Sequence, residues 1–252
     1  MFELNGKTAL ITGASSGLGA HFSRVLSDAG ARVILAARRL DRLESLAFDI
    51  AGAGGEAAPV EMDVTDPASV EAAFDWIKQD GGAADIIVNN SGMSRDAFAH
   101  EMEEDDWSAV MDTNLTGAWR VAKAGARALI DAGKPGSIIN IASITAYGTS
   151  QTLGAYAASK AAIDHLTRYM ALELARHRIR VNALAPGYFI TDLNSAFFET
   201  EQGEKMVRRI PMRRTGELHE LAGPLLLLAS DTGSYMTGST LVVDGGHLQR
   251  GL

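Results

Sequence analysis

Short runs of apolar, β-prone residues alternate along the chain with segments whose apolar residues recur at helical spacing. The first run, residues 7–12, ends in a glycine-rich turn. Segment 17–30 follows, and its pattern predicts a helix closed by glycine. In segment 40–53 the apolar residues fall on one helical face. This pattern predicts strands and helices in regular alternation.

The alternation continues to the end of the chain and predicts seven strands. The predicted strands are 7–12, 32–36, 58–62, 85–89, 137–142, 179–185 and 240–244. The predicted helices are 17–30, 40–53, 67–79, 103–132, 155–177 and 217–229. Most of the strands are continuous apolar runs, which is typical of strands buried on both faces. We therefore expect an α/β Rossmann fold, with a doubly wound parallel sheet of about seven strands and helices on both faces.

The length of 252 residues suits one large α/β domain and is short for two. We expect a single domain over 1–252. Residues 188–215 contain no predicted strand and are rich in Phe, Glu and Arg. Because ligands bind beyond the carboxyl ends of the strands in a doubly wound sheet, and this stretch follows such an end, we predict a substrate lid there.

Composition excludes several classes of function. A net charge of −8 without a basic cluster argues against nucleic acid and anionic membranes as partners. The absence of cysteine excludes thiolate catalysis and zinc–thiolate sites. The six histidines show no paired ligand spacing, so we predict no catalytic metal. The chain shows no signal-peptide pattern, and its longest apolar run is far below the roughly 20 residues that span a bilayer, so we expect a cytoplasmic protein.

The first predicted strand leads into the turn Thr-Gly-Ala-Ser-Ser-Gly-Leu-Gly. Glycines let the backbone approach a pyrophosphate, and the following helix directs its free N–H groups at the anion. Such a turn is common on its own, but its place in the first strand–helix unit favours a dinucleotide site. The predicted phosphate-binding residues are Gly13, Ser15, Ser16, Gly17, Leu18 and Gly19.

This glycine spacing resembles that of the short-chain dehydrogenase/reductase family, and the resemblance extends along nearly the whole chain. It implies that Asp63 and Val64 contact adenine. Residues 89–92 are similar to the family's Asn-Asn-Ala-Gly segment, with serine in place of alanine. Pro186-Gly187 followed by Thr191 resembles the segment that clasps the nicotinamide amide. The further coenzyme contacts implied within residues 89–92 are Asn90, Ser91 and Gly92.

The end of the second predicted strand indicates the coenzyme. An NAD site usually has Asp or Glu here, hydrogen-bonded to the ribose 2′-hydroxyl. This strand ends instead in Arg38 and Arg39, and no acid occurs before Asp41. Because a guanidinium fork matches a 2′-phosphate, we predict NADP(H). Arg38 is the stronger candidate, whereas Arg39 would stack over the adenine or face solvent.

Ser143, Tyr156 and Lys160 form the pattern S-x12-Y-x3-K, which predicts the catalytic group. Tyr156 and Lys160 are four residues apart and share one helical face. We expect the lysine ammonium, together with oxidised nicotinamide, to lower the phenol pKa toward neutrality. Tyr156 would then protonate a carbonyl oxygen while Ser143 donates a hydrogen bond to it. The resemblance adds Asn114, which would position a water, and gives Lys160 a contact with the nicotinamide ribose.

The expected substrate is a small carbonyl compound or alcohol. Aromatic and apolar residues of the lid favour a ketone with hydrophobic substituents: Tyr188, Phe189, Leu193, Phe197 and Phe198. A 3-oxoacyl-carrier-protein reductase and a sugar-acid dehydrogenase remain alternatives. The carrier-bound substrate is disfavoured because Asp131 and Leu172 stand where such reductases tend to offer basic residues. The intact catalytic pattern argues against a non-catalytic dinucleotide-binding regulator.

The resemblance also implies a homotetramer. Two long helices, 103–132 and 155–177, would pack across a two-fold axis in a symmetric interface. We expect small residues of the first helix to allow their close approach: Ala122, Ala124, Gly125, Ala126 and Ala128.

Overall fold

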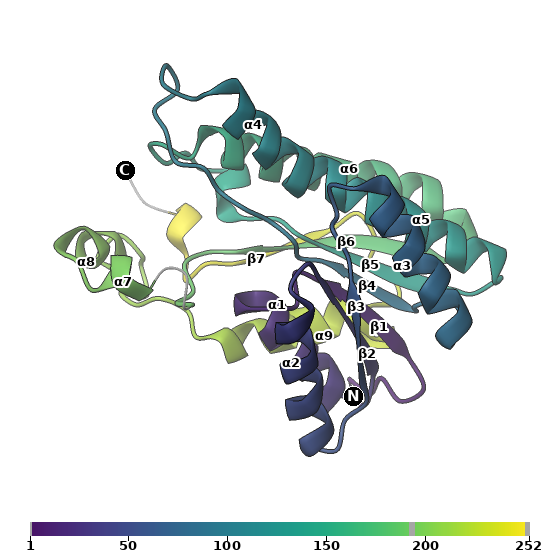
Figure 1. The fold of residues 1–252 in the computed structure, drawn as a ribbon. Coiled ribbons are helices and arrows are strands. Elements are labelled where there is room, and N and C mark those ends of the chain that lie inside the picture. Colours follow the sequence, from purple (N-terminus) through teal and green to yellow (C-terminus); the bar gives the residue numbers. More distant parts are fainter. Residues whose placement is uncertain (1, 192–194, 250–252) are drawn as a thin grey trace.

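The computed structural model describes residues 2–191 and 195–249 (Figure 1). Within these ranges seven strands form one parallel sheet in the order β3-β2-β1-β4-β5-β6-β7. The strands are β1 (Thr8–Thr12), β2 (Arg32–Ala37), β3 (Ala57–Glu61), β4 (Ile86–Asn89), β5 (Gly136–Ile141), β6 (Ile179–Pro186) and β7 (Thr240–Val243). The strand order reverses where β1 lies between β2 and β4, which confirms the predicted doubly wound sheet.

Helices cover both faces of the sheet (Figure 1). One face carries α1 (Gly17–Asp28), α2 (Leu40–Gly52) and α9 (Ala222–Ala229). The other carries α3 (Pro67–Asp80), α5 (Ala118–Asp131) and α6 (Gly154–Leu174). The remaining helical elements are α4 (Glu104–Met111), α7 (Ser195–Phe198) and α8 (Glu201–Val207), and the short turns η1 (Asp112–Gly117), η2 (Ile144–Ala146), η3 (Ala175–His177), η4 (Leu218–Leu221), η5 (Asp231–Gly233) and η6 (His247–Gln249).

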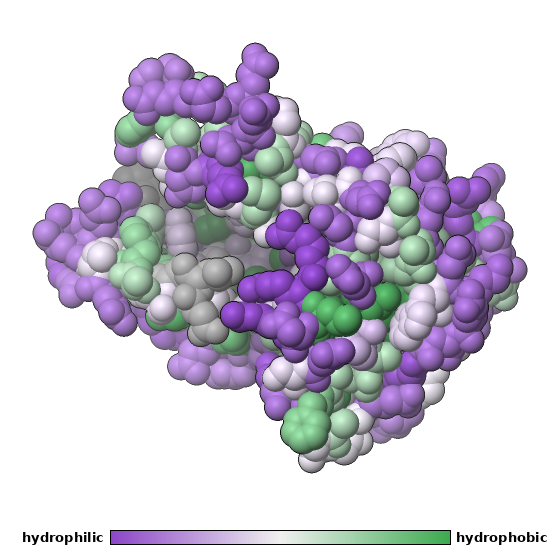
Figure 2. Space-filling view, in the orientation of Figure 1, coloured by the Kyte–Doolittle hydropathy of each residue, from purple (hydrophilic) through white to green (hydrophobic). Residues whose placement is uncertain are grey.

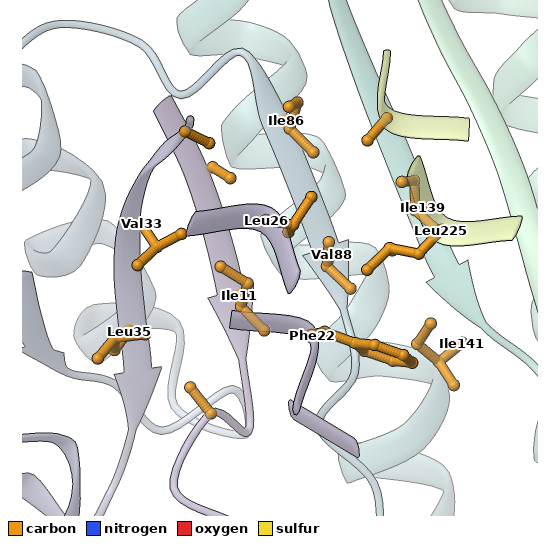
Figure 3. Packing of buried hydrophobic residues seen from close by; sticks show 14 of the residues in the cluster. Ile11, Phe22, Leu26, Val33, Leu35, Ile86, Val88, Ile139, Ile141 and Leu225 are labelled. Carbon is orange, nitrogen blue, oxygen red and sulfur yellow. The ribbon is translucent and has the colours of Figure 1, made fainter. Parts of the chain in front are cut away.

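The two core layers follow from the period of a β-strand, because successive side chains point to opposite faces. Ile11 and Val88 belong to the cluster beneath α1 and α9, where Phe22 points toward Ile141 (Figure 3). Their sequence neighbours Leu10 and Ile87 belong to the opposite cluster, beneath α3 and α5. Apolar runs in the sequence therefore correspond to strands that are buried on both faces.

The helix predicted over 103–132 is interrupted. It consists of α4, a π-helical turn over η1 and then α5. Gly117 ends the π turn against Val64, where an added Cβ would come within 2.7 Å of the valine Cγ2. The helix predicted over 217–229 begins as the 3₁₀ turn η4, and α9 starts just before Pro224, which lacks the N–H that a helix interior requires.

The small residues of α5 serve a different purpose from the one expected. Ala122, Gly125 and Ala126 are buried against the sheet within one chain. A Cβ on Gly125 would lie 2.0 Å from Ile87 Cδ1, so the small side chains let α5 approach β4. Ala124 and Ala128 also pack against this core cluster. For the buried residues Ala122, Gly125 and Ala126, the sequence explanation as a helix–helix interface was therefore wrong.

The described residues show neither a membrane-spanning helix nor a cluster of metal ligands. No helix in 2–191 and 195–249 combines the length and apolar character needed to cross a membrane. Over the same part of the chain, no group of three or more His, Asp and Glu side chains is placed to hold a metal ion.

Candidate active site

A cavity of about 630 Å³ opens at the carboxyl ends of the strands. In Figure 2 the surface is hollowed between the helices α7 and α8 and the loop before α4. The cavity brings together most of the predicted residues: Gly13, Ser15, Ser16, Gly17, Leu18, Arg38, Arg39, Asp63, Val64, Asn90, Ser91, Gly92, Ser143, Tyr156, Lys160, Pro186, Gly187 and Thr191. Gly19 and Asn114 do not line it.

The turn between β1 and α1 has the backbone that a bound phosphate requires. Gly13 and Gly17 adopt φ values of +66° and +54°, which L side chains rarely adopt. Ser16 caps α1 without a side-chain hydrogen bond, so the first N–H groups of the helix remain for an anion. Gly19 does not line the cavity but lets α1 pack closely against the turn, because a Cβ there would lie 2.2 Å from the Gly13 oxygen. This cradle fits the pyrophosphate of a dinucleotide.

Thr12 and Asn90 join the ends of β1 and β4 beneath this turn. The Thr12 hydroxyl oxygen accepts hydrogen bonds of 3.0 Å from the backbone N–H groups of Asn90 and Ser91. The Asn90 side-chain amide donates in return to the Thr12 carbonyl oxygen at 3.0 Å. Thr12 was not singled out from the sequence, although it is the first residue of the glycine-rich motif.

The two arginines after β2 face different parts of the cavity. Arg39 donates to the Ser15 hydroxyl at 2.8 Å and to the Ser16 hydroxyl at 3.3 Å. Arg38 instead acts on Asp63: burial raises the pKa of that carboxyl, but hydrogen bonds from Thr65 and the charge of Arg38 lower it overall. Arg39 therefore lies beside the phosphate turn, whereas the sequence had suggested that it stacks over the adenine or faces solvent. Arg38, the residue predicted to bind the 2′-phosphate, also lines the cavity.

Ser143 and Tyr156 both line the cavity, and the Ser143 hydroxyl acts on the Tyr156 phenol so as to lower its pKa. Ser143 follows β5 and caps η2, where its hydroxyl oxygen accepts from the Thr145 N–H at 3.1 Å. With that acceptor position used, the Ser143 hydroxyl proton is free to point toward Tyr156 or a substrate oxygen. Lys160 lies one turn further along α6, with its Nζ 5.5 Å from the centre of the Tyr156 ring.

The electrostatics of Tyr156 differ from the expectation. Burial raises the pKa of the Tyr156 phenol, and the Ser143 hydroxyl opposes that rise only in part. The Lys160 ammonium does not lie at the phenol oxygen, because it donates a 2.7 Å hydrogen bond to the Ile141 carbonyl oxygen. Burial lowers the pKa of Lys160 to about 8. The site as described therefore holds Tyr156 in its protonated form at neutral pH.

Asn114 connects the segment after Gly92 with the catalytic helix. Its Oδ1 accepts from the Met93 N–H at 2.8 Å, and its Nδ2 donates to the Met93 oxygen at 2.9 Å. The same amide donates to the Ser159 hydroxyl at 3.0 Å, one residue before Lys160. The side chain thus braces the wall of the site, and these bonds occupy the amide that was expected to orient a water. Nothing in the sequence pattern had indicated Ser159.

A buried carboxylate anchors the substrate side of the catalytic helix. Asp164 lies two turns beyond Tyr156 and accepts hydrogen bonds from the hydroxyls of Tyr147 at 2.5 Å and Thr240 at 2.6 Å. Arg168 completes the group with an ion pair of 2.5 Å. These bonds fasten the segment after Ser143 to both α6 and β7. The sequence offered no signal for this group, because its members are distant along the chain.

Aromatic rings cluster around Tyr188, which lines the cavity. The Tyr188 ring lies 6.0 Å from that of Phe198 and 5.4 Å from that of His247, which comes from the C-terminal turn η6. Phe197 packs edge-on against Phe198. Phe189 is buried. Leu193, also predicted for this wall, lies outside the described residues.

Comparison with known proteins places these features in a family. The family model described as enoyl-(acyl carrier protein) reductase matches residues 13–247. The chain is 36% identical to gluconate 5-dehydrogenase of Gluconobacter oxydans, over 98% of this chain and 96% of the relative. It is 37% identical to 3-oxoacyl-[acyl-carrier-protein] reductase of Thermotoga maritima, over 97% of this chain and 98% of the relative. A solved structure of a gluconate 5-dehydrogenase from Burkholderia cenocepacia, in complex with NADP and tartrate, is 39% identical in sequence. The match covers 99% of this chain and 98% of that chain, with a TM-score of 0.95.

Proposed function

The chain belongs to the short-chain dehydrogenase/reductase family, and we propose that Ser143, Tyr156 and Lys160 carry its reaction, the NADP(H)-dependent interconversion of a ketone and a secondary alcohol. The observation that supports this assignment best is that Ser143, Tyr156 and Lys160 line one cavity together with the predicted coenzyme residues. Two hydroxyls in the wall of one cavity can both reach one substrate oxygen. That arrangement suits a carbonyl group better than the carbon–carbon double bond of an enoyl substrate.

Each side chain has a defined part in the reductive direction. The bound coenzyme supplies hydride to the carbonyl carbon. Ser143 donates a hydrogen bond to the carbonyl oxygen, and Tyr156 transfers its proton to that oxygen as negative charge develops there. Lys160 holds α6 against the end of β5, and its ammonium makes the surroundings of the phenol more favourable to the anion that remains.

The coenzyme would lie along the edge of the sheet. The first turn of α1 would hold the pyrophosphate, and Asp63 with Val64 would contact the adenine. Arg38, Arg39 and Ser15 would bind the 2′-phosphate, since two guanidinium groups and a hydroxyl surround that part of the cavity. Pro186, Gly187 and Thr191 would contact the nicotinamide.

The substrate enters between the catalytic group and the lid, which we assign to residues 188–215 of a single domain spanning 1–252. Small sugar acids and 3-oxoacyl groups are the substrates named for the relatives, so both classes belong in the first test. NADPH consumption should be followed with neutral ketones, oxo acids and 3-oxoacyl thioesters. Turnover of at least one carbonyl compound supports the proposal, whereas no turnover with any of them would contradict it.

We also propose that the enzyme is a cytoplasmic homotetramer. NADP(H) dependence supports the location, since this coenzyme is maintained inside cells. Exposed apolar side chains on α5 and α6 support the assembly: Trp119, Ile130, Tyr169 and Leu172. Leu172 is 81% exposed in the single chain, and a two-fold contact between these helices would remove it from water.

A further inference from the structure

The helix α6 is bonded to the segment that carries Ser143 at two points, one on each side of the serine. Lys160 Nζ donates to the Ile141 oxygen at 2.7 Å, two residues before Ser143. Asp164 Oδ1 accepts from the Tyr147 hydroxyl at 2.5 Å, four residues after Ser143. We propose that Asp164, acting through Tyr147, is a positioning residue that fixes the Ser143 hydroxyl in the active site. This inference deepens the proposed function and rests on it, because it concerns the same reaction.

One face of α6 carries the proton donor and both attachment points. Tyr156, Lys160 and Asp164 follow one another at intervals of four residues, which places them on neighbouring turns of the same face. Lys160 and Asp164 are both buried, so this face is turned toward the interior of the site. Because the helix holds the Ser143 segment from that face, it also sets the separation of the Ser143 and Tyr156 hydroxyls.

The link from Tyr147 back to Ser143 is a single turn of hydrogen-bonded backbone, η2. The Tyr147 N–H donates to the Ile144 oxygen at 3.0 Å, and the Ala146 N–H donates to the Ser143 oxygen at 3.0 Å. The Ser143 hydroxyl itself accepts from the Thr145 N–H at 3.1 Å. Since these bonds close the turn, a shift of Tyr147 would be passed on to the Ser143 hydroxyl.

Asp164 is a firm anchor because other elements hold it as well. Its Oδ1 also accepts from the Thr240 hydroxyl of β7 at 2.6 Å, and its Oδ2 pairs with Arg168 at 2.5 Å. Hydrogen bonds to an ionised carboxylate are roughly twice as strong as those between neutral groups. Burial raises the pKa of Tyr147 and the bond to Asp164 raises it further, so the hydroxyl keeps the proton that it donates.

The effect of this group on the reaction has to pass through Ser143. Asp164 and Tyr147 do not line the cavity, whereas Ser143 does, so neither of the two is placed to touch substrate or coenzyme. The Tyr147 ring is 45% exposed and adds little to the core. Its bond to Asp164 is therefore the contact by which this side chain constrains the segment.

The test is a double-mutant cycle between Tyr147→Phe and Ser143→Ala. The readout is the rate of hydride transfer from NADPH to the best carbonyl substrate in a single turnover, into which product release does not enter. Tyr147→Phe keeps the ring and removes only the hydroxyl that binds Asp164. We expect it to lower this rate about tenfold, because a misplacement of about 1 Å can cost about a hundredfold. The Kd for NADPH should stay within about twofold, because the coenzyme residues are untouched.

The second half of the cycle separates positioning from a general loosening of the fold. In a Ser143→Ala enzyme, Tyr147→Phe should lower the rate by less than about twofold, since the hydroxyl to be positioned is absent. Asp164→Asn should lower the wild-type rate by a factor similar to that of Tyr147→Phe, and the two changes together should have no greater effect, because both break one link. Tyr235→Phe is the matched control: it removes the same hydroxyl from a fully exposed tyrosine and should leave the rate unchanged.

A rate loss by Tyr147→Phe that depends on the Ser143 hydroxyl supports the inference. The inference is overturned if Tyr147→Phe keeps the wild-type rate, or if it lowers the rate by the same factor with and without that hydroxyl. Both of these results leave the proposed reaction intact. Absence of turnover by the wild type with any carbonyl compound would instead contradict the reaction itself, and the inference with it.

Discussion

The Lys160 ammonium donates a 2.7 Å hydrogen bond to the carbonyl oxygen of Ile141, the last residue of β5. The bond joins the catalytic helix to the strand that presents Ser143 two residues later. Lys160 is buried, and burial lowers its pKa from 10.5 to about 8. The same contact that orders the site therefore places an ammonium group where water cannot solvate it.

This burial predicts a dependence of stability on pH. Between pH 8 and 10.5 the unfolded chain holds the Lys160 proton and the folded chain does not, so the free energy of unfolding rises with pH across that window. The slope from this one group is at most about 1.4 kcal/mol per pH unit, and below pH 8 it vanishes. Lys160→Met should lack this contribution. Urea unfolding of both proteins at several pH values checks this prediction. If the free energies of unfolding of the two proteins change with pH in parallel, the pKa of Lys160 is not lowered in the folded protein.

The phenol of Tyr156 predicts opposite pH profiles for the two directions. Because burial raises its pKa, Tyr156 keeps its proton at neutral pH. The kcat/KM for reduction should therefore be nearly constant around neutral pH. Oxidation requires the phenolate, so its kcat/KM should rise into the alkaline range. Ser143→Ala removes the hydroxyl that opposes the rise in the Tyr156 pKa, so the oxidation profile should move to higher pH. Initial rates in both directions across pH test this, and an oxidation profile that falls with pH would contradict it.

The two arginines after β2 predict the coenzyme preference. Wild type should prefer NADPH to NADH, and Arg38→Asp should shift the preference toward NADH. Arg39→Ala should raise the KM for NADPH by about tenfold or more and leave that for NADH nearly unchanged, because a charge-assisted contact to the 2′-phosphate is lost. Arg42→Ala, an exposed charge of α2 outside the cavity, serves as the control. Equal use of both coenzymes by the wild type would show that these assignments are wrong.

Leu172 provides a test of the assembly. Leu172→Glu should shift the sedimenting species from a tetramer to smaller ones, because it places charge in the proposed two-fold contact between α5 and α6 helices. Phe48 is equally exposed, at 81%, but lies on α2 on the opposite face of the sheet. Phe48→Glu should leave the assembly unchanged. A wild-type protein that sediments as a stable monomer at micromolar concentration would contradict the proposal.

The sequence predicted the fold because buried parallel strands have a strong local signature. The run before Gly13 is apolar on both faces, and the turn after it needs residues that tolerate positive φ, so strand and turn are visible without a structure. The same holds for Tyr156 and Lys160, whose spacing alone places them on one helical face.

What the sequence did not predict depends on partners distant along the chain. Asn114 in the π turn is hydrogen-bonded to Met93 and Ser159, which no local pattern connects with it. The orientation of Lys160 toward Ile141 required the position of β5, and the burial that raises the pKa of Tyr156 required the packing of the whole site. The segment predicted as a lid appeared only apolar because its aromatic residues dominate the pattern, whereas the contact of the Tyr188 ring with His247, far along the chain, became apparent only in the structure.

The central claim is that Tyr156 protonates the substrate in an NADPH-dependent carbonyl reduction. The most direct measurement is kcat for the best substrate with wild type and with Tyr156→Phe, alongside the Kd of each protein for NADPH. The account predicts that the variant loses about a hundredfold or more of kcat, since general acid catalysis is removed, while its Kd for NADPH stays within about twofold because the ring remains. A Tyr156→Phe enzyme that retains a tenth of the wild-type kcat would contradict the account.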